Sequence, residues 1–181
     1  MKAAPRGGAA SSTILFIFRS DGRLLAFSEN KMNIVILAAG MGKRMHSRLP
    51  KVLQPIAGRP MIDHVLDASE GLSASPRVVV VGHAAENVME HLADRSDVTF
   101  ALQSPQLGTG HALRQALGQL DRNEPKTLVC LGDVPLLSRR TLEAIAREAE
   151  TSDLVLLTVE LDNPTGYGRI LRNPAGFVRA I

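Results

Sequence analysis

The sequence predicts an α/β fold in which helices cover both faces of a mostly parallel sheet. Short runs rich in β-branched residues alternate with longer stretches whose apolar residues recur every three or four positions. The first pattern is typical of strands and the second of amphipathic helices. The expected strands are also apolar throughout, and strands that are buried on both faces are typical of parallel sheets.

Five strands are expected, and each is a short run dominated by Val, Ile, Leu or Thr. In chain order they are NIVILAA (33–39), RVVVVG (77–82), VTFAL (98–102), TLVCLG (127–132) and DLVLLTVE (153–160). Further on, the turn-forming sequence NPAG (173–176) indicates a hairpin, whose second strand the chain enters before its last residue.

Four helices are expected in the intervals between these strands. They are MIDHVLDASEG (61–71), AENVMEHLAD (85–94), GHALRQALGQL (110–120) and RRTLEAIAREAE (139–150). Parallel strands need long crossover connections, which are usually helices. The strict alternation of strand and helix therefore supports the parallel arrangement.

Residues 1–31 differ in composition from the rest of the chain. They contain the small-residue tract AAPRGGAASS (3–12) and one apolar burst, TILFIF (13–18). This burst is shorter than the apolar region of a signal peptide and far shorter than a membrane span. We expect a disordered extension, or upstream translation ahead of a start at Met32; an organelle transit peptide is the alternative.

Composition and charge exclude several classes of function. Of the 21 Lys and Arg and the 18 Asp and Glu, five and two respectively lie within residues 1–31, so the remaining residues hold 16 of each sign. This neutral balance and the near absence of aromatic residues argue against a nucleic-acid partner. The single cysteine, Cys130, excludes an internal disulfide framework, is expected to be buried and inert, and fits a reducing, cytoplasmic setting.

Three polar or glycine-rich loops directly follow expected strands. They are AAGMGKR (38–44), QSPQLGTG (103–110) and GDVP (132–135). In open α/β sheets, ligands bind beyond the carboxyl ends of the strands. The three loops therefore share one edge of the sheet, and we expect the functional site there.

The first of these loops fits neither of two familiar phosphate-binding motifs. A dinucleotide-binding motif would need glycine at Met45, and a P-loop would need glycine at Leu37 and Ser or Thr at Arg44. What remains is a turn in which Gly40 and Gly42 let backbone N–H groups approach an anion, with the planar Arg44 guanidinium suited to phosphate oxygens. An ordinary surface loop is the alternative.

Four motifs in order carry a resemblance to a known family. LAAGMGKRMHSRLPK (37–51) resembles the signature of sugar-1-phosphate nucleotidyltransferases. LQSPQLGTGHA (102–112) is similar to the uridyltransferase half of the bacterial bifunctional N-acetylglucosamine-1-phosphate uridyltransferase and glucosamine-1-phosphate acetyltransferase family. LGDVPLL (131–137) and DNPTGYGRI (162–170) match in the same order. The resemblance implies a Rossmann-like, mixed and mostly parallel sheet of the nucleotide-diphospho-sugar transferase type.

The resemblance also implies an activity and roles for individual residues. UTP and N-acetylglucosamine 1-phosphate would give UDP-N-acetylglucosamine, a cell-wall precursor, and pyrophosphate, with Mg²⁺ as cofactor. Arg44 and Lys51 would bind the triphosphate and its developing charge, and Asp133 would be the Mg²⁺ ligand and the third catalytic residue. Gln103, Gly108 and Thr109 match uracil-binding positions. The expected substrate-binding residues are Leu37, Ala38, Ala39, Gly40, Lys51, Gln103, Gly108, Thr109, Leu131, Gly132, Asp133 and Gly168.

Several alternatives stay open at this point. Gln103 is also consistent with a polar strand end, Asp133 with a turn cap, and the segment around Gly168 with a simple turn. The histidines are expected to be structural or surface residues. The chain could also be an inactive nucleotide-binding fragment, or a relative that uses another sugar phosphate or nucleotide.

The resemblance extends over residues 32–181, which we expect to form a partial nucleotidyltransferase domain, incomplete at its C-terminal end. The family's downstream Glu and Asn that contact the sugar, and a later Asn that shares the magnesium, match no position up to Ile181. The hexapeptide repeats of the acetyltransferase half have no match either. Full-length homologues are expected to be homotrimers through that C-terminal half.

Overall fold

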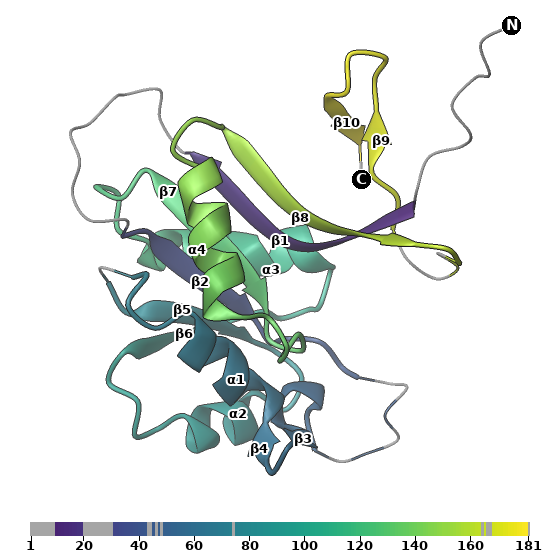
Figure 1. The fold of residues 1–181 in the computed structure, drawn as a ribbon. Coiled ribbons are helices and arrows are strands. Elements are labelled where there is room, and N and C mark those ends of the chain that lie inside the picture. The colour runs from purple at the N-terminus through teal and green to yellow at the C-terminus, as the bar shows by residue number, and fades with distance from the viewer. Residues whose placement is uncertain are drawn as a thin grey trace, which may run out of the picture.

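The computed structural model describes residues 10–19, 31–42, 45, 47, 49–73, 75–163, 165 and 168–180. A six-stranded sheet with the order β6-β5-β2-β7-β1-β8 forms its centre (Figure 1). The strands are β1 (Ala10–Arg19), β2 (Asn33–Leu37), β5 (Arg77–Val81), β6 (Val98–Leu102), β7 (Lys126–Leu131) and β8 (Leu154–Leu161). The helices are α1 (Met61–Ala68), α2 (Ala85–His91), α3 (Thr109–Ala116) and α4 (Arg139–Glu148).

The sheet confirms the predicted α/β architecture. β6, β5, β2 and β7 are parallel neighbours, whereas β1 runs antiparallel to both β7 and β8. The short elements are the 3-10 helices η2 (Lys51–Leu53) and η3 (Leu117–Gln119), the pair β3 (Pro55–Ile56) and β4 (Arg59–Pro60), and the hairpin β9 (Leu171–Arg172) and β10 (Val178–Ala180). The hairpin lies around the turn sequence that predicted it.

Strand β1 differs from the expectation of a disordered extension. Residues 10–19 lie inside the sheet between β7 and β8, while residues 1–9 and 20–30 lie outside the described residues. The apolar burst 13–18 consists of β-branched, aromatic and leucine residues, a composition that favours strands. Among the described residues, no helix is long and apolar enough to span a membrane.

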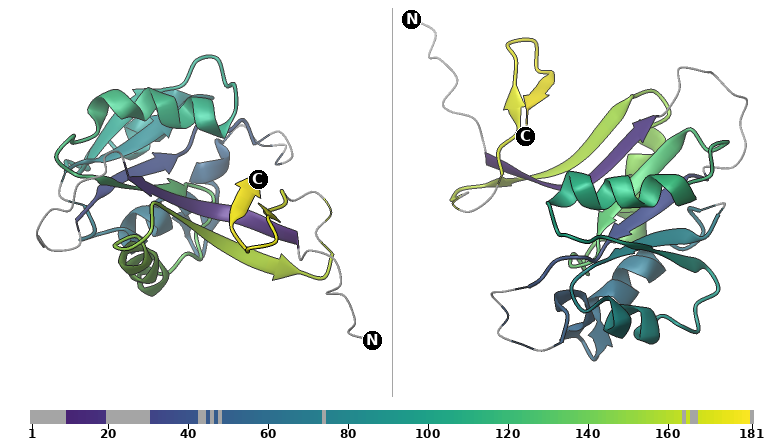
Figure 2. Two further views of the ribbon diagram at one scale, coloured as in Figure 1. Left: turned by 90° about the horizontal axis from the view of Figure 1, so that it is seen from above. Right: turned by 180° about the vertical axis from the view of Figure 1, so that it is seen from behind.

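The two faces of the sheet carry different helices. Alternate side chains of a strand point to opposite faces, so Ile34 and Ile36 pack toward α1, α2 and α4, while Val35 packs toward α3. Figure 2 shows α3 and α4 on opposite sides of the sheet. Helix α4 begins after Ser138, whose hydroxyl accepts a hydrogen bond of 3.2 Å from the backbone N–H of Thr141.

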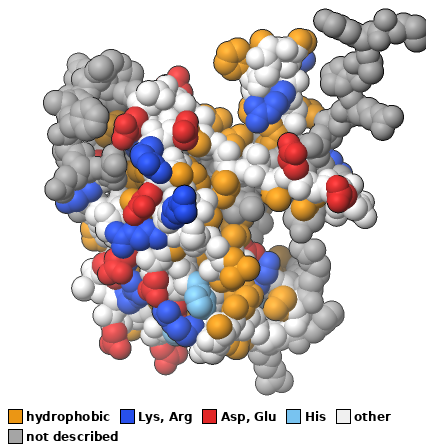
Figure 3. All heavy atoms as spheres, in the orientation of Figure 1, with side chains coloured by type: hydrophobic (Ala, Val, Ile, Leu, Met, Phe, Trp, Pro, Cys, Tyr) orange, Lys and Arg blue, Asp and Glu red, His pale blue; other side chains and the backbone are white. Residues whose placement is uncertain are grey.

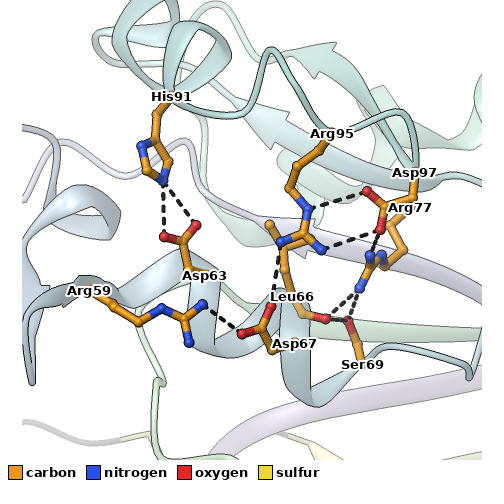
Figure 4. Close-up of polar contacts among 9 residues, drawn as sticks. All are labelled: Arg59, Asp63, Leu66, Asp67, Ser69, Arg77, His91, Arg95 and Asp97. Atoms are coloured by element: carbon orange, nitrogen blue, oxygen red, sulfur yellow. Dashed lines mark hydrogen bonds and ion pairs between the residues drawn. The ribbon is translucent and has the colours of Figure 1, made fainter.

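Arg77, the first residue of β5, is a buried cation with several partners (Figure 4). Only 3% of its surface is exposed. Its guanidinium donates to the carbonyl oxygen of Leu66 and to the Ser69 hydroxyl, and it forms an ion pair with Asp97. Burial lowers the pKa of Arg77. The side chain thus ties the end of α1 to the segment that leads into β6.

The surface around α1 and α4 carries charges of both signs (Figure 3). Asp67 contributes to two ion pairs there, at 2.6 Å with Arg59 and 3.5 Å with Arg95. Burial alone would raise the pKa of Asp67, but the two arginines lower it overall. Acidic and basic side chains are therefore mixed on this face.

Replacing Arg77 should destabilise the fold more than replacing an exposed arginine. Arg77→Met removes a buried donor from the Leu66 carbonyl and the Ser69 hydroxyl and the ion-pair partner of Asp97, so we expect the free energy of unfolding to fall by about 1–3 kcal/mol. Urea unfolding followed by circular dichroism measures it. Arg59→Met is the matched control and should change the unfolding midpoint little; equal shifts in the two variants would contradict this role of Arg77.

The Cys130 thiol should be unreactive in the folded protein. Burial raises its pKa to about 12, so the nucleophilic thiolate is scarce at pH 8. We expect a disulfide reagent to label Cys130 rapidly in urea and very slowly without it. The thiol of the unfolded chain has the lower pKa and ionises first as pH rises. The contribution of this thiol to the free energy of unfolding is therefore lost between about pH 9 and 12. Fast labelling of the folded protein would contradict its burial.

Candidate functional site

A cavity of about 380 Å³ lies where the loops after β2, β6 and β7 meet. Its walls include ten of the residues predicted from the sequence: Leu37, Ala38, Ala39, Gly40, Lys51, Gln103, Gly108, Thr109, Leu131 and Asp133. The predicted edge of the sheet is therefore where these residues gather. Four further residues line the cavity and were not predicted: Met41, Val52, Gln106 and Ala112.

Backbone hydrogen bonds hold the loops in place beyond the last residues of the strands. Leu37 of β2 is in register with Leu131 of β7. The N–H of Gly132 donates to the carbonyl of Leu37 at 3.0 Å, and the N–H of Ala38 donates to the carbonyl of Val80 at 2.8 Å. The floor of the cavity is thus a direct continuation of the parallel ladder.

Lys51 and Asp133 form an ion pair at the cavity. Lys51 Nζ donates to Asp133 Oδ2 at 2.5 Å, with 35% and 30% of the two side chains exposed. Lys51 begins η2 after Pro50, and Asp133 follows β7. The pair brings an ammonium and a carboxylate, 82 residues apart in sequence, to one wall of the cavity.

Gly42 packs directly against Lys51. Its φ is +56°, a left-handed conformation that side chains disfavour, and a Cβ at this position would lie 2.9 Å from the Lys51 Cβ. Gly40, two residues earlier, has open space around it. The two glycines of the loop therefore have different structural roles.

Gln103 forms the opposite side of the cavity, at the end of β6. Only 3% of it is exposed. Its Nε2 donates to the carbonyl of Gly108 at 3.0 Å and lies 3.1 Å from Nδ1 of His111. Gln106 Nε2 in turn donates to the Gln103 backbone carbonyl at 3.4 Å. The amide of Gln103 is therefore held by its own loop and by the first turn of α3.

Gly82 was not predicted as a site residue, although a close approach requires glycine there. A Cβ on Gly82 would lie 2.8 Å from the Ala39 Cβ and 2.9 Å from Gln106 Nε2. The signal in the sequence was its position directly after β5. Gly82 lets the first loop and the Gln106 loop approach each other.

Some predicted residues do not line the cavity. Gly132 lies behind its wall, where an added Cβ would meet the Leu37 carbonyl oxygen at 3.2 Å. Gly168 is exposed, and a Cβ added to it would meet open space. Arg44 lies outside the described residues, as do Lys43 and Arg48. The roles of Gly132, Gly168 and Arg44 in substrate binding stay predictions.

The metal-binding potential of the cavity rests on Asp133. Within the described part of the chain there is no group of three or more His, Cys, Asp or Glu side chains that could hold a metal. Mg²⁺, however, is commonly bound by one or two carboxylates together with substrate phosphates. A single carboxylate on the cavity wall fits a metal that arrives with a phosphate ligand.

A second cavity, of about 460 Å³, lies away from the carboxyl ends of the parallel strands. It is lined by Lys31, Gly71, Leu72, Arg139, Glu143, Ala146 and Arg147. Arg139, its central cation, pairs with Glu143 at 3.1 Å within α4. Because none of the strand-end loops reaches it, the smaller cavity is the better candidate site.

Comparisons with known proteins point to one family. A family model described as "MobA-like NTP transferase domain" matches residues 34–174. The chain is 61% identical over 147 residues to the bifunctional protein GlmU of Cupriavidus pinatubonensis, covering 81% of this chain and 32% of that protein. It is 58% identical over 150 residues to GlmU of Burkholderia lata, covering 83% and 33%. The chain thus spans about a third of these relatives, which confirm the resemblance found in the motifs.

Solved structures show the same fold. Rv0371c from Mycobacterium tuberculosis matches with a TM-score of 0.55 and 26% identity, over 66% of this chain and 60% of that chain. A nucleotidyl transferase from a Methanothermobacter species matches with a TM-score of 0.56 and 27% identity, over 65% and 57%. A structure of Rv0371c in complex with manganese also matches, with a TM-score of 0.52 and 25% identity, over 66% and 59%.

The two loop glycines should respond differently to a methyl group. Gly42→Ala combines a disfavoured φ with a clash against Lys51, so we expect the free energy of unfolding to fall by roughly 1–3 kcal/mol. Gly40→Ala is the matched control, because its added Cβ meets open space. Thermal and urea unfolding of both variants measure the difference. A Gly42→Ala protein as stable as Gly40→Ala would contradict the close packing on Lys51.

Proposed function

The chain belongs to the family of MobA-like NTP transferase domains, and on this basis we propose that it transfers UMP from UTP to N-acetylglucosamine 1-phosphate. The products are UDP-N-acetylglucosamine, a cell-wall precursor, and pyrophosphate. One observation carries the proposal: a single cavity holds a cation and a carboxylate on one wall and a buried amide on another. The similarity to the GlmU proteins supports the choice of nucleotide and sugar phosphate.

The uracil base binds beside Gln103. The oxygen of the Gln103 amide can accept a hydrogen bond from the ring N–H of a pyrimidine. Gly108 and Thr109 border the same part of the cavity and begin α3, so their backbone groups contact the base. Ala112, one turn further along α3, is apolar and packs against the ring.

The triphosphate binds along the loop after β2. The backbone of the segment 37–40 borders the triphosphate, with the N–H groups of Ala39 and Gly40 facing its oxygens, and Lys51 neutralises part of its charge. We assign Arg44 to the same role because its guanidinium fits phosphate oxygens. Gly132 and Gly168 complete the proposed substrate contacts through their backbones.

The reaction is an in-line displacement at the α-phosphorus of UTP. A phosphate oxygen of N-acetylglucosamine 1-phosphate forms the new P–O bond, and the bond to the bridging oxygen breaks as pyrophosphate leaves with its electron pair. No covalent bond to the protein forms. Catalysis therefore comes from positioning the two substrates and from stabilising charge on the transferred group.

Asp133 is the proposed ligand of a divalent cation, and we propose Mg²⁺ as the ion. The manganese complex of the related Rv0371c supports a divalent metal in this family. The ion, when bound with the triphosphate, would neutralise charge on its oxygens. Lys51 pairs with Oδ2 of Asp133 in the structure, so the ion would bind through Oδ1 or take the place of the Lys51 ammonium.

The wider setting of the domain is also a proposal. We infer that residues 32–181 are part of a nucleotidyltransferase domain, to whose sheet residues 10–19 add strand β1. We expect a cytoplasmic protein with no nucleic-acid or membrane partner. We propose that full-length relatives form homotrimers through their C-terminal half.

Loss of the Lys51 ammonium should slow turnover. A charge-assisted hydrogen bond contributes on the order of 1.5–3 kcal/mol, so we expect Lys51→Ala to lower the rate at least tenfold. Pyrophosphate release is measured with UTP, N-acetylglucosamine 1-phosphate and Mg²⁺, beside CTP and GTP controls. Lys126→Ala, at the far end of β7, is the control and should retain the rate. A near-normal rate for Lys51→Ala would remove this role.

Asp133→Asn should abolish activity in the same assay, and excess Mg²⁺ should not restore it, because an amide is a poor ligand for a hard cation. Titration with Mn²⁺, followed by its paramagnetic signal in the presence of UTP, measures binding independently of turnover. Wild-type affinity in Asp133→Asn would show that another group holds the metal. UTP binding without pyrophosphate release by the wild-type chain would indicate a nucleotide-binding fragment.

A further inference from the structure

The side chain of Gln103 has only one orientation that satisfies its hydrogen bonds. Its terminal amide atom lies 3.0 Å from the carbonyl oxygen of Gly108, which is an acceptor only. The atom facing Gly108 must therefore be the nitrogen, since an oxygen there would face another oxygen. This fixes Nε2 toward Gly108 and leaves its second hydrogen for another partner.

That partner is the imidazole of His111. Nδ1 of His111 lies 3.1 Å from Gln103 Nε2. Because the amide nitrogen can only donate, Nδ1 must accept and carries no proton. A neutral imidazole has one protonated nitrogen, so the proton is on Nε2.

The amide of Gln115, one turn further along α3, also approaches His111. Its Nε2 donates to the His111 backbone carbonyl at 3.2 Å and lies 3.2 Å from His111 Nε2. A neutral imidazole has only one nitrogen that can accept. Gln115 is only partly buried and can turn away from a protonated Nε2, whereas the Gln103 amide is buried and held by the Gly108 carbonyl. The contact with Gln103 therefore decides which nitrogen of His111 accepts.

The oxygen of the Gln103 amide receives no hydrogen bond from any residue that the structure describes, although Gln103 is 3% exposed and lines the cavity. Buried polar atoms normally have hydrogen-bond partners. An acceptor left open on a cavity wall indicates that a bound ligand supplies the donor.

We propose that His111 is a positioning residue for base selection, which holds the Gln103 amide with its oxygen toward the base. This inference rests on the proposed function. A base with a ring N–H, such as uracil, donates to this oxygen, whereas the unprotonated ring nitrogen of cytosine presents a second acceptor and is repelled. Without the Nδ1 acceptor, the Gln103 amide is free to turn and the preference weakens.

The test is the ratio of the dissociation constants for UTP and CTP, measured by calorimetry with Mg²⁺. In His111→Leu the acceptor is absent, and we expect the preference for UTP to fall about 10- to 100-fold. His111→Asn places an amide oxygen near the former Nδ1, and should restore the preference to within about threefold of wild type. His91→Leu, on α2, is the matched control and should leave the ratio unchanged.

The outcomes separate this inference from the proposed function. Equal binding of UTP and CTP by the wild-type chain, or binding of neither, would overturn both. Two results would overturn the inference but leave the proposed function standing. In the first, His111→Leu keeps the wild-type preference for UTP. In the second, His111→Asn loses this preference to the same extent as His111→Leu.

A spectroscopic measurement tests the inference without a substitution. Imidazole ¹⁵N chemical shifts of the wild-type protein report which ring nitrogen carries the proton. We expect the Nε2–H form for His111. A proton on Nδ1 would overturn the role of this residue, even if His111→Leu failed to fold.

Discussion

The parallel pairing of β2 with its neighbours is the constraint on which the rest of the structure depends. β2 lies between β5 and β7, and the carboxyl ends of the three strands coincide at one edge. The ladder continues one residue further, because the N–H of Gly132 bonds to the carbonyl of Leu37. Lys51 and Asp133 meet only because these strand ends are fixed side by side. The chemistry of the cavity is therefore set by backbone register as much as by side chains.

The two edges of the sheet use buried amides in opposite ways. At the amino edge, Asn33 is 4% exposed; its Nδ2 donates to the carbonyls of Asp121 and Glu124, and its Oδ1 accepts from the N–H of Asp121. Its hydrogen-bonding capacity is used for holding a loop. At the carboxyl edge, Gln103 is buried to a similar degree, but no described residue donates to the oxygen of its amide, which lies beside a cavity. This contrast distinguishes an amide that stabilises the fold from one that faces a ligand.

Most of the fold could be predicted from the sequence, because periodicity is a local property. The strand expected over residues 127–132 is Lys126–Leu131, and the helix expected over 85–94 is Ala85–His91. The position of strand β1 in the sheet could not be predicted, since its antiparallel partners β7 and β8 lie far from it in the sequence. In the site, the motifs predicted ten lining residues, but the link from His111 to Gln103 depends on side-chain geometry that no motif contains. Gln106 belongs to the QSPQLGTG loop, but no feature of the sequence distinguished it from its neighbours as a residue that lines the cavity.

The position of β1 has a consequence for the order in which the chain folds. Its Leu15 pairs with Cys130, about 115 positions further along, and its partners in β8 are made later still. At translation rates of roughly 5–20 residues per second, this apolar segment waits on the order of ten seconds for its first neighbour. Long-range pairing of this kind is slow, because the loop must close before the contact forms. Among the strands of this sheet, β1 is synthesised first, yet its pairing can form only after β7 and β8 have been made.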